Sequence, residues 1–358
     1  MNKNSIRDTY IDIVKGIGII SIVIGHSGWV LPIGKGVNIG TFVYSYHIML
    51  FLFVAGYCFK NIYSADPYSY IGKRIKSICP LYVKYNIVFV LLHNILRRIH
   101  IIDSEQKIYT VNEIISKILS SFALVTSEGM LGAFWFLPMY LFAICIFCIL
   151  FSWAERTNRK NVVHGVIIIL SGLAGIYINW NQMYLNYHIQ TSILAIPLIY
   201  IGYFCKLKWE WIYNYLSVVV GILCAAVIYW IMSLDIGIVE LTVNSIINPY
   251  LFFPVTLMGI YFCLSLAKVL NHFTITRKIF SLVGKNSFHI MALHFLGIKI
   301  VDLIYGNIIN AEPSVIEGYP HGFNLWFVYW IFGILIPLFL VISIRKIRFV
   351  IIKDDSSK

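Results

Sequence analysis

Residues 12–26 read DIVKGIGIISIVIGH and residues 44–57 read YSYHIMLFLFVAGY, and these two apolar stretches decide the fold class. With its flanks, each approaches the ~20 residues that a helix needs to cross a ~30 Å hydrocarbon core. Each stretch also carries one histidine, His26 in the first and His47 in the second. Because an ionisable side chain at that depth is costly, it usually faces a cavity or a partner. Both histidines are therefore candidate functional residues.

The first stretch places its ionisable side chains along one face of a helix. The rise from Lys15 to His26 is roughly 16 Å, about half of the hydrocarbon core. That face runs from a charged pair at the membrane edge to an imidazole near the bilayer middle, so we expect a reactive group that is reached from the surface. At about 100° per residue, one stripe holds Asp12, Lys15, Ile19, Ile22 and His26.

The same apolar character extends along the whole chain of 358 residues, of which 59% are hydrophobic and 12% are charged, with a mean hydropathy of +0.80. Soluble domains average about 25% charged residues. We therefore predict an all-α polytopic membrane protein, with residues 1–350 as a single transmembrane domain and residues 351–358 as a short polar cytoplasmic tail. About ten spans are predicted, at 14–32, 40–60, 80–97, 132–153, 162–179, 190–206, 213–233, 248–269, 281–304 and 324–345.

The net charge of +12 follows from the predicted topology. If the N-terminus is cytoplasmic, most of the 28 Lys and Arg residues lie in segments inside the cell, which is the positive-inside pattern. An even number of spans then places both termini in the cytoplasm. The basic balance indicates a lipid bilayer as partner and no nucleic acid. The basic residues left in outside segments are Lys35, Arg97, Arg98, Lys107, Lys117 and Lys299.

The seven cysteines lie in or beside the predicted spans and form no framework of loop-borne pairs. Cys145 and Cys148 have CxxC spacing, but they lie within an apolar helix that has no nearby His or Cys partners. We therefore interpret them as packing residues. No metal site is expected.

The longest polar insert covers residues 98–131. Within it, the segment VNEIISKILSSFALV predicts an amphipathic helix that lies on the outer membrane interface. No soluble domain remains once the spans and this insert are assigned.

A basic segment, GKRIKSICPLY, follows the second span. It puts Lys73, Arg74 and Lys76 at the cytoplasmic edge, and Pro80 opens the third span at a position where proline is tolerated. Positive charge here is expected from topology alone. It also suits a phosphate clamp, because clustered Lys and Arg side chains supply charge-assisted hydrogen bonds. A cytoplasmic anionic substrate such as a coenzyme A thioester would fit this clamp.

These strings, taken together with three later ones, resemble the acyltransferase-3 family of integral membrane O-acyltransferases. The resemblance runs from about residue 7 to 345 and is greatest to the sugar O-acetylase-like branch, which has a histidine in the second span. The strings occur in the order DIVKGIGIISIVIGHS, YSYHIMLFLFVAGY, GKRIKSICPLY, GAFWFLPMYLF, SILAIPLIYIGYFCK and LVGKNSFHIMALHF.

The resemblance implies an O-acetyltransferase with ten membrane helices in the bacterial cytoplasmic membrane. It would move an acetyl group from cytoplasmic acetyl-CoA to a hydroxyl of a cell-envelope glycan or a lipid-linked sugar. The family motif of an arginine, ten residues and an essential histidine is matched here by Lys15 and His26. His26 would be the general base, a role that suits histidine near neutral pH. His47 would orient the acceptor or partner His26.

Further roles follow from the same resemblance. Acetyl-CoA would dock its phosphates on four basic residues, and three residues in later strings would contact the acceptor side of the site. The cofactor-binding set is Lys15, Lys73, Arg74 and Lys76, and the substrate-binding set is Trp135, His294 and Asn286.

Simpler interpretations stay open for several of these residues. His26 could be a neutral imidazole that donates to a neighbouring helix, and Trp135 could be an aromatic of the membrane interface. Asn286 could cap or bridge helices. Asp302 and Glu317 are expected to be solvated charges of the outer loops.

Two questions of mechanism also stay open at this stage. The acetyl group could pass directly to the acceptor, or it could rest briefly on His26 as an acyl-imidazole. From a different functional class, a transporter or flippase could use the buried histidines as a proton relay. Consumption of acetyl-CoA separates that function from an acyltransferase.

Overall fold

The computed structural model describes residues 9–27, 32–34, 37–125, 128–234, 236–246 and 248–355, with side chains described up to residue 347. Helices dominate these residues, and the strands within them are β1 (Pro32–Gly34) and β2 (Val37–Asn38). The predicted all-α class is therefore confirmed. Predictions that fall outside the described residues concern the end of the first span at 28–31 and the charges of Lys3, Arg7, Lys35 and Lys358.

Within the described residues, nine helical segments are long and apolar enough to cross a membrane, and a tenth is added if one bent pair counts as a span. The prediction of about ten spans is thus confirmed, whereas the sidedness of the termini stays a prediction. The segments are α1 (Thr9–Ser27), α2 with α3 (Ile39–Tyr44 and His47–Cys58), α4 (Pro67–Arg98), η2 with α6 (Gly129–Trp135 and Phe136–Glu155), α7 (Lys160–Trp180), η3 with α8 (Asn186–His188 and Ile189–Leu207), α11 (Phe252–His272), α13 (Ser287–Ile308) and α15 (Trp326–Asp355).

The predicted span 213–233 is broken into α9 (Trp209–Tyr215) and α10 (Val218–Met232), which are bent by 80°. The break has a local cause, because the Ser217 side chain accepts a hydrogen bond from Val220 N and begins a new helix. Lys268 Nζ donates to the carbonyls of Tyr213 and Leu216 at 2.8 Å each. These bonds satisfy carbonyl groups at the end of α9.

The third span begins much earlier than the sequence predicted. The Asp66 side chain accepts from Ser69 N and Pro67 takes the first helical position, so α4 starts at residue 67 and runs for 32 residues. Pro80 therefore lies inside α4, and the prediction that it opens the span is wrong. As a result, Lys73 and Arg74 lie on a helix and not in a connecting loop.

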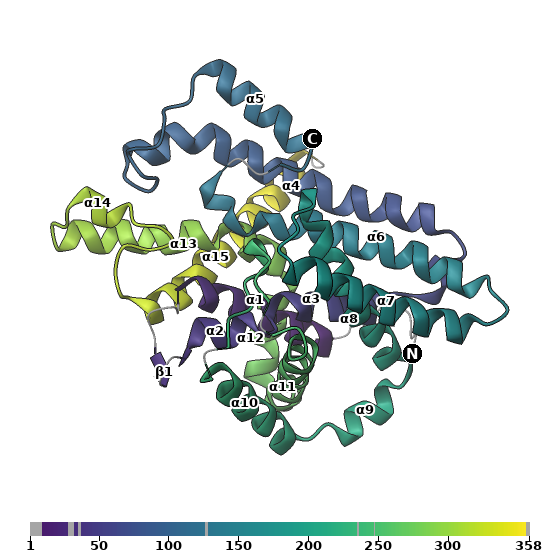
Figure 1. Ribbon diagram of the computed structural model, residues 1–358. Coiled ribbons are helices and arrows are strands. Elements are labelled where there is room, and N and C mark those ends of the chain that lie inside the picture. The colour runs from purple at the N-terminus through teal and green to yellow at the C-terminus, as the bar shows by residue number, and fades with distance from the viewer. Residues whose placement is uncertain are drawn as a thin grey trace.

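Two amphipathic helices flank the spans. The predicted helix of the polar insert is α5 (Val111–Phe122), which begins with a capping box between Thr110 and Glu113. It lies beside α4 (Figure 1) and leaves Val111, Ile115 and Leu119 more than half exposed. The second is α12 (Thr274–Lys285), which separates from α13 at Asn286 and makes the ninth span start later than predicted. The remaining short elements are η1 (Asn61–Ser64), η4 (Leu241–Val243) and α14 (Pro313–Ile316).

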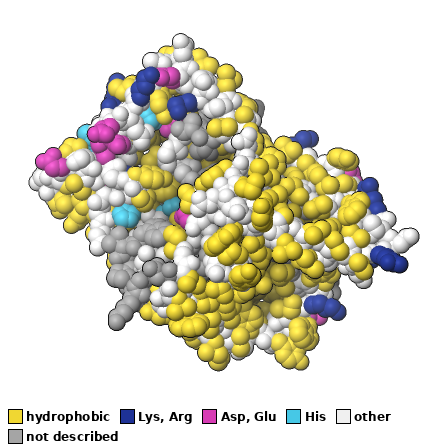
Figure 2. Space-filling view, viewed as in Figure 1, with side chains coloured by type: hydrophobic (Ala, Val, Ile, Leu, Met, Phe, Trp, Pro, Cys, Tyr) yellow, Lys and Arg dark blue, Asp and Glu magenta, His cyan; other side chains and the backbone are white. Residues whose placement is uncertain are grey.

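The first helix lies in the middle of the bundle, where it packs against α3, α11, α12, α13 and α15 (Figure 1). Small residues allow close approach of the backbones. A side chain at Gly16 would meet the Phe280 carbonyl of α12, and one at Gly56 would meet the Ile199 carbonyl of α8. Hydrophobic side chains cover much of the outer surface, while charges lie on the lobe around α5 and α14 and, mostly as Lys and Arg, along the opposite edge (Figure 2). This distribution suits a bundle surrounded by lipid.

Candidate active site

His26 lies in the last two turns of α1 and meets two rings from α13. Its ring centroid is 5.1 Å from that of His294 and 4.7 Å from that of Phe295. The two α13 rings lie 4.2 Å from each other. The bundle therefore joins two histidines that are far apart in the sequence.

The ring of Tyr44 packs near both His47 and His26. Tyr44 lies 4.6 Å from the His47 ring and 6.3 Å from the His26 ring, measured between centroids. Because α2 and α3 fold back on α1, the expected hairpin forms and brings both histidines to one region. His294, however, is the imidazole that packs directly against His26.

Backbone carbonyls fix the proton positions of both neighbouring histidines. His294 Nδ1 lies 2.9 Å from the Met291 carbonyl, and His47 Nδ1 lies 2.9 Å from the Val43 carbonyl. Since a carbonyl can only accept, each Nδ1 carries the proton and each Nε2 is left as an acceptor. The Nε2 atom of His294 is buried and has no hydrogen-bond partner among the described residues. An acceptor nitrogen without a hydrogen-bond partner among the described residues therefore lies on the imidazole that packs against His26.

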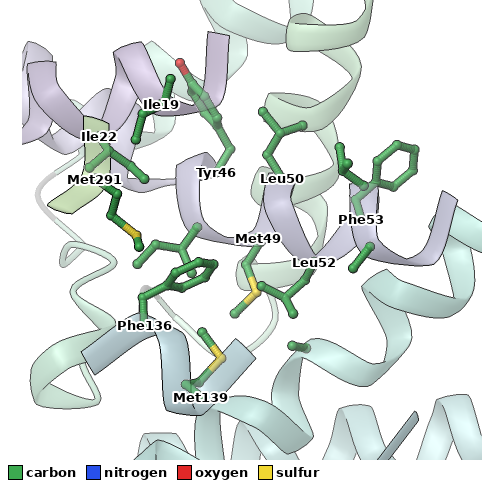
Figure 3. Packing of buried hydrophobic residues seen from close by; sticks show 14 of the residues in the cluster. Ile19, Ile22, Tyr46, Met49, Leu50, Leu52, Phe53, Phe136, Met139 and Met291 are labelled. Carbon is green, nitrogen blue, oxygen red and sulfur yellow. The ribbon is translucent and has the colours of Figure 1, made fainter. Parts of the chain in front are cut away.

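A cavity of about 180 Å³ lies along α1 and reaches Ile22 and Met291, one helical turn before His26 and His294. Three of its lining residues, Lys15, Ile19 and Ile22, belong to the predicted stripe that ends at His26. Figure 3 shows Ile22, Met291 and Phe136 converging on this space. The cavity is also lined by Phe51, Val54, Ile78, Leu137, Tyr140, Ser287 and Phe288.

The four basic residues predicted to bind the donor divide into two pairs. Lys15 lines the cavity and pairs with Asp12 at 2.8 Å, and Arg74 is half-buried over the Tyr70 ring at 4.8 Å. Arg74 also interacts electrostatically with Tyr140 of the cavity wall. Lys73 and Lys76 are exposed on α4. The structure therefore places Lys15 at the cavity and Arg74 on Tyr70 behind its wall, and it leaves the other two lysines at the surface.

Trp135 and Asn286 do not contact the histidine pair. The Trp135 ring packs on His188 at 4.7 Å. Asn286 is buried between α12 and α13, where its amide donates to the Leu282 carbonyl at 2.8 Å. Its neighbour Ser287 lines the cavity. The capping interpretation of Asn286 agrees with this geometry.

The charges expected to be solvated in outer loops are buried, so that prediction is wrong. Asp302 is fully buried on α13 and pairs with Lys299 at 3.0 Å. Glu317 accepts hydrogen bonds from His100 Nδ1 at 2.7 Å and from Ser104 Oγ at 2.8 Å. Long-range partners decide this burial, and the sequence does not show which loops meet.

Some residues of the site were not predicted. Phe295, Tyr44 and Met291 each contact a histidine or hold one in place. A weak signal was present, since Tyr44 lies one helical turn from His47 and Met291 one turn from His294. Apolar and aromatic residues fill every span, so this spacing does not distinguish them from core residues.

The fold, with its intramembrane histidines and a cavity that reaches Ile22 and Met291 one helical turn from two of them, defines a multi-pass membrane protein with a candidate internal site. The family model described as an acyltransferase domain matches residues 8–346. The chain therefore belongs to the acyltransferase-3 family, which identifies it as a membrane acyltransferase. No curated protein and no solved structure matches the chain.

Proposed function

We propose that this protein is an O-acetyltransferase of the bacterial cytoplasmic membrane. It transfers an acetyl group from cytoplasmic acetyl-CoA to a hydroxyl of a cell-envelope glycan or a lipid-linked sugar. His26 acts as the general base, with His294 and His47 as neighbouring imidazoles.

One observation carries this proposal: the cavity beside α1 leads from Lys15 to the turn that holds His294. Met291 lines the cavity and accepts the hydrogen bond from His294 Nδ1. A narrow apolar space suits an extended acyl-pantetheine chain better than a sugar. Lys15 and Arg74 at the cavity supply positive charge for the donor phosphates.

The direct reaction needs one proton acceptor and no change of oxidation state. A ring nitrogen of His26 takes the proton of the acceptor hydroxyl as its oxygen attacks the thioester carbon. The new C–O bond forms, the C–S bond breaks, and the leaving thiolate takes the proton from the imidazolium. In the covalent variant, the unprotonated His26 nitrogen attacks the thioester carbon, so that a C–N bond forms, the C–S bond breaks and the leaving thiolate takes the N–H proton of the ring. The acceptor hydroxyl then attacks the acyl-imidazole, so that the C–O bond forms, the C–N bond breaks and the hydroxyl proton passes to the imidazole.

The test uses membranes of the native host from which the gene has been deleted and to which variants are returned. We expect His26→Ala to lower transfer of isotopically labelled acetyl from acetyl-CoA to envelope material by about 10²-fold or more, because general-base assistance contributes that much. His272 is an exposed histidine on α11. As the matched control, His272→Ala should stay within about twofold of the original activity.

Two outcomes would contradict the proposal at different levels. If His26→Ala keeps more than about a tenth of the activity at equal membrane abundance, His26 is not the base. If the unmodified protein neither transfers label nor gains thermal stability from acetyl-CoA, the acetyltransferase function is wrong and a transport function is favoured.

A further inference from the structure

A second cavity, of about 400 Å³, lies at the opposite end of the bundle. The helices give its position: α13 begins at Ser287 beside the first cavity, passes His294 and ends at Ile308. The segment after Ile308 forms one wall of the second cavity, and the segment after the end of α4 at Arg98 forms the other. The two cavities therefore lie on opposite sides of the histidine pair. The second is lined by Ile101, Ile102, Asp103, Ser104, Glu105, Gln106, Gly129, Met130, Ser314, Glu317, Gly318 and Tyr319.

Buried polar bonds hold the wall that follows α13. Lys299 is 1% exposed and donates to Asp302 Oδ2 at 3.0 Å and to the Gly318 carbonyl at 2.9 Å. Asp302 also accepts from Gly322 N at 2.9 Å and from the Tyr329 hydroxyl. Because removing a charged pair from water is costly, this network is better explained by positioning the wall than by stability.

The wall that follows α4 is fixed by equally specific contacts. Arg97 donates through Nε to the Gln106 carbonyl at 2.6 Å and through Nη2 to the Ser104 carbonyl. Glu317 joins the two walls, because it accepts from His100 and Ser104 while lining the cavity. The cavity is therefore preorganised.

The chemistry of the lining defines a class of ligand. Three acidic residues line the cavity, Asp103, Glu105 and Glu317, and none of the described residues that line it is Lys or Arg. Such a lining repels carboxylate and phosphate groups. Serine and glutamine side chains at the same surface can pair with hydroxyls.

An aromatic ring connects this cavity to the active site. Tyr319 is 57% exposed, and its ring lies 5.2 Å from Phe295, which in turn lies 4.7 Å from His26. The Tyr319 hydroxyl donates to the Gly129 carbonyl at 3.1 Å, which holds the ring in place. An exposed aromatic face beside hydroxyl-pairing groups is suited to one face of a sugar ring.

We propose that this second cavity binds the acceptor as a sugar unit without carboxylate or phosphate groups, with Tyr319 as its stacking surface. The inference rests on the proposed acetyltransferase function and deepens it. The acceptor then approaches His26 from the side of Tyr319 and Phe295, while the donor thioester arrives from the Lys15 side. The two substrates then meet at His26 from opposite ends of the bundle.

The experiment fills the cavity with a side chain. Ser314 is exposed on α14 and lines the cavity, whereas Ser233 is exposed at the same end of the bundle, where it ends α10. In the gene-deleted host, Ser314→Trp should restore less than about a tenth of the acetyl ester on envelope glycans, and the control Ser233→Trp should restore it within about twofold. Tyr319→Ala should lower the ester content about fivefold or more, while Tyr250→Ala, at a tyrosine that is 86% exposed, should not. Immunoblots verify equal membrane abundance.

Mass spectrometry of the esterified fragment tests the ligand class. An ester on a sugar unit that lacks carboxylate and phosphate supports the proposal, and an ester on a uronic acid or another anionic unit overturns it. Equal ester content with Ser314→Trp and Ser233→Trp also overturns it. If the unmodified gene itself restores no ester, the proposed function fails, which is a separate result.

Discussion

The two cavities that flank His26 differ in how they are built and in what they can bind. The cavity beside Lys15 is formed by side chains of packed helices and is largely apolar, whereas the cavity beside Tyr319 is formed by connecting segments that carry carboxylates. Packed helices can line an apolar cavity without further hydrogen bonds, because their backbone groups are already paired within each helix. Connecting segments supply polar groups to a cavity, but their backbone must be held in place by buried hydrogen bonds, such as the one from Lys299 to the Gly318 carbonyl. The difference shows that one fold can form two cavities of opposite chemical character.

The largest effect is expected from filling the cavity beside Lys15 with a larger side chain. Ile78 lines it, and Ile75 is 43% exposed on the same helix. Ile78→Trp should weaken the use of acetyl-CoA about 5- to 150-fold, since overfilling costs about 1–3 kcal/mol. Ile75→Trp should change it little. The apparent KM for acetyl-CoA in membrane assays provides the measurement, and equal values for both variants would show that the donor does not use this cavity.

A smaller effect distinguishes the basic residues of α4. Arg74 is half-buried beside the cavity wall, and Lys73 is exposed. Arg74→Ala should raise the KM for acetyl-CoA about tenfold or more, because hydrogen bonds to charged groups contribute about 1.5–3 kcal/mol. Lys73→Ala should stay within about threefold, as expected of an exposed charge. The reverse order would place the donor phosphates on the outer face of α4.

The smallest expected effect is on thermal stability at acidic pH, and it concerns Glu317 in the cavity beside Tyr319. Burial raises the pKa of Glu317, but hydrogen bonds from His100 and Ser104 outweigh it and leave this pKa below its usual value. A carboxyl with a lowered folded pKa stabilises the fold above its unfolded pKa, and this contribution is lost as the pH falls through the folded pKa. Thermal midpoints measured from pH 6 to pH 3 should therefore fall more steeply for the original protein than for Glu317→Gln. Parallel curves would show that the carboxylate does not join the two walls in solution.

Much of the fold could be predicted from the sequence, because the signal was local. Apolar runs of membrane length and the amphipathic pattern of residues 111–122 depend only on nearby residues, and both correspond to helices. The errors occurred where capping or a tertiary contact decided a boundary. Asp66 and Pro67 start α4 early, and Ser217 with Lys268 divides the predicted seventh span.

The site was predictable in part for the same reason. Lys15 and His26 share a helical face, so one wall of the donor cavity could be derived from spacing alone. The contact between His26 and His294 could not, since nothing local to either residue gives the distance between α1 and α13. The burial of Asp302 and Glu317 depended likewise on partners in distant segments.

The sequence by itself determined that this chain crosses a membrane many times, that helices form in its apolar runs, and that it resembles a family of acyltransferases. Only the tertiary structure decided which imidazole lies beside His26, which basic residues reach a cavity, and that a second, polar cavity exists. The physical reason is that helix formation and membrane insertion are governed by neighbouring residues, whereas a site is a set of distances between helices. Those distances are fixed by packing, such as the close approach at Gly16 and Gly56, across the whole bundle.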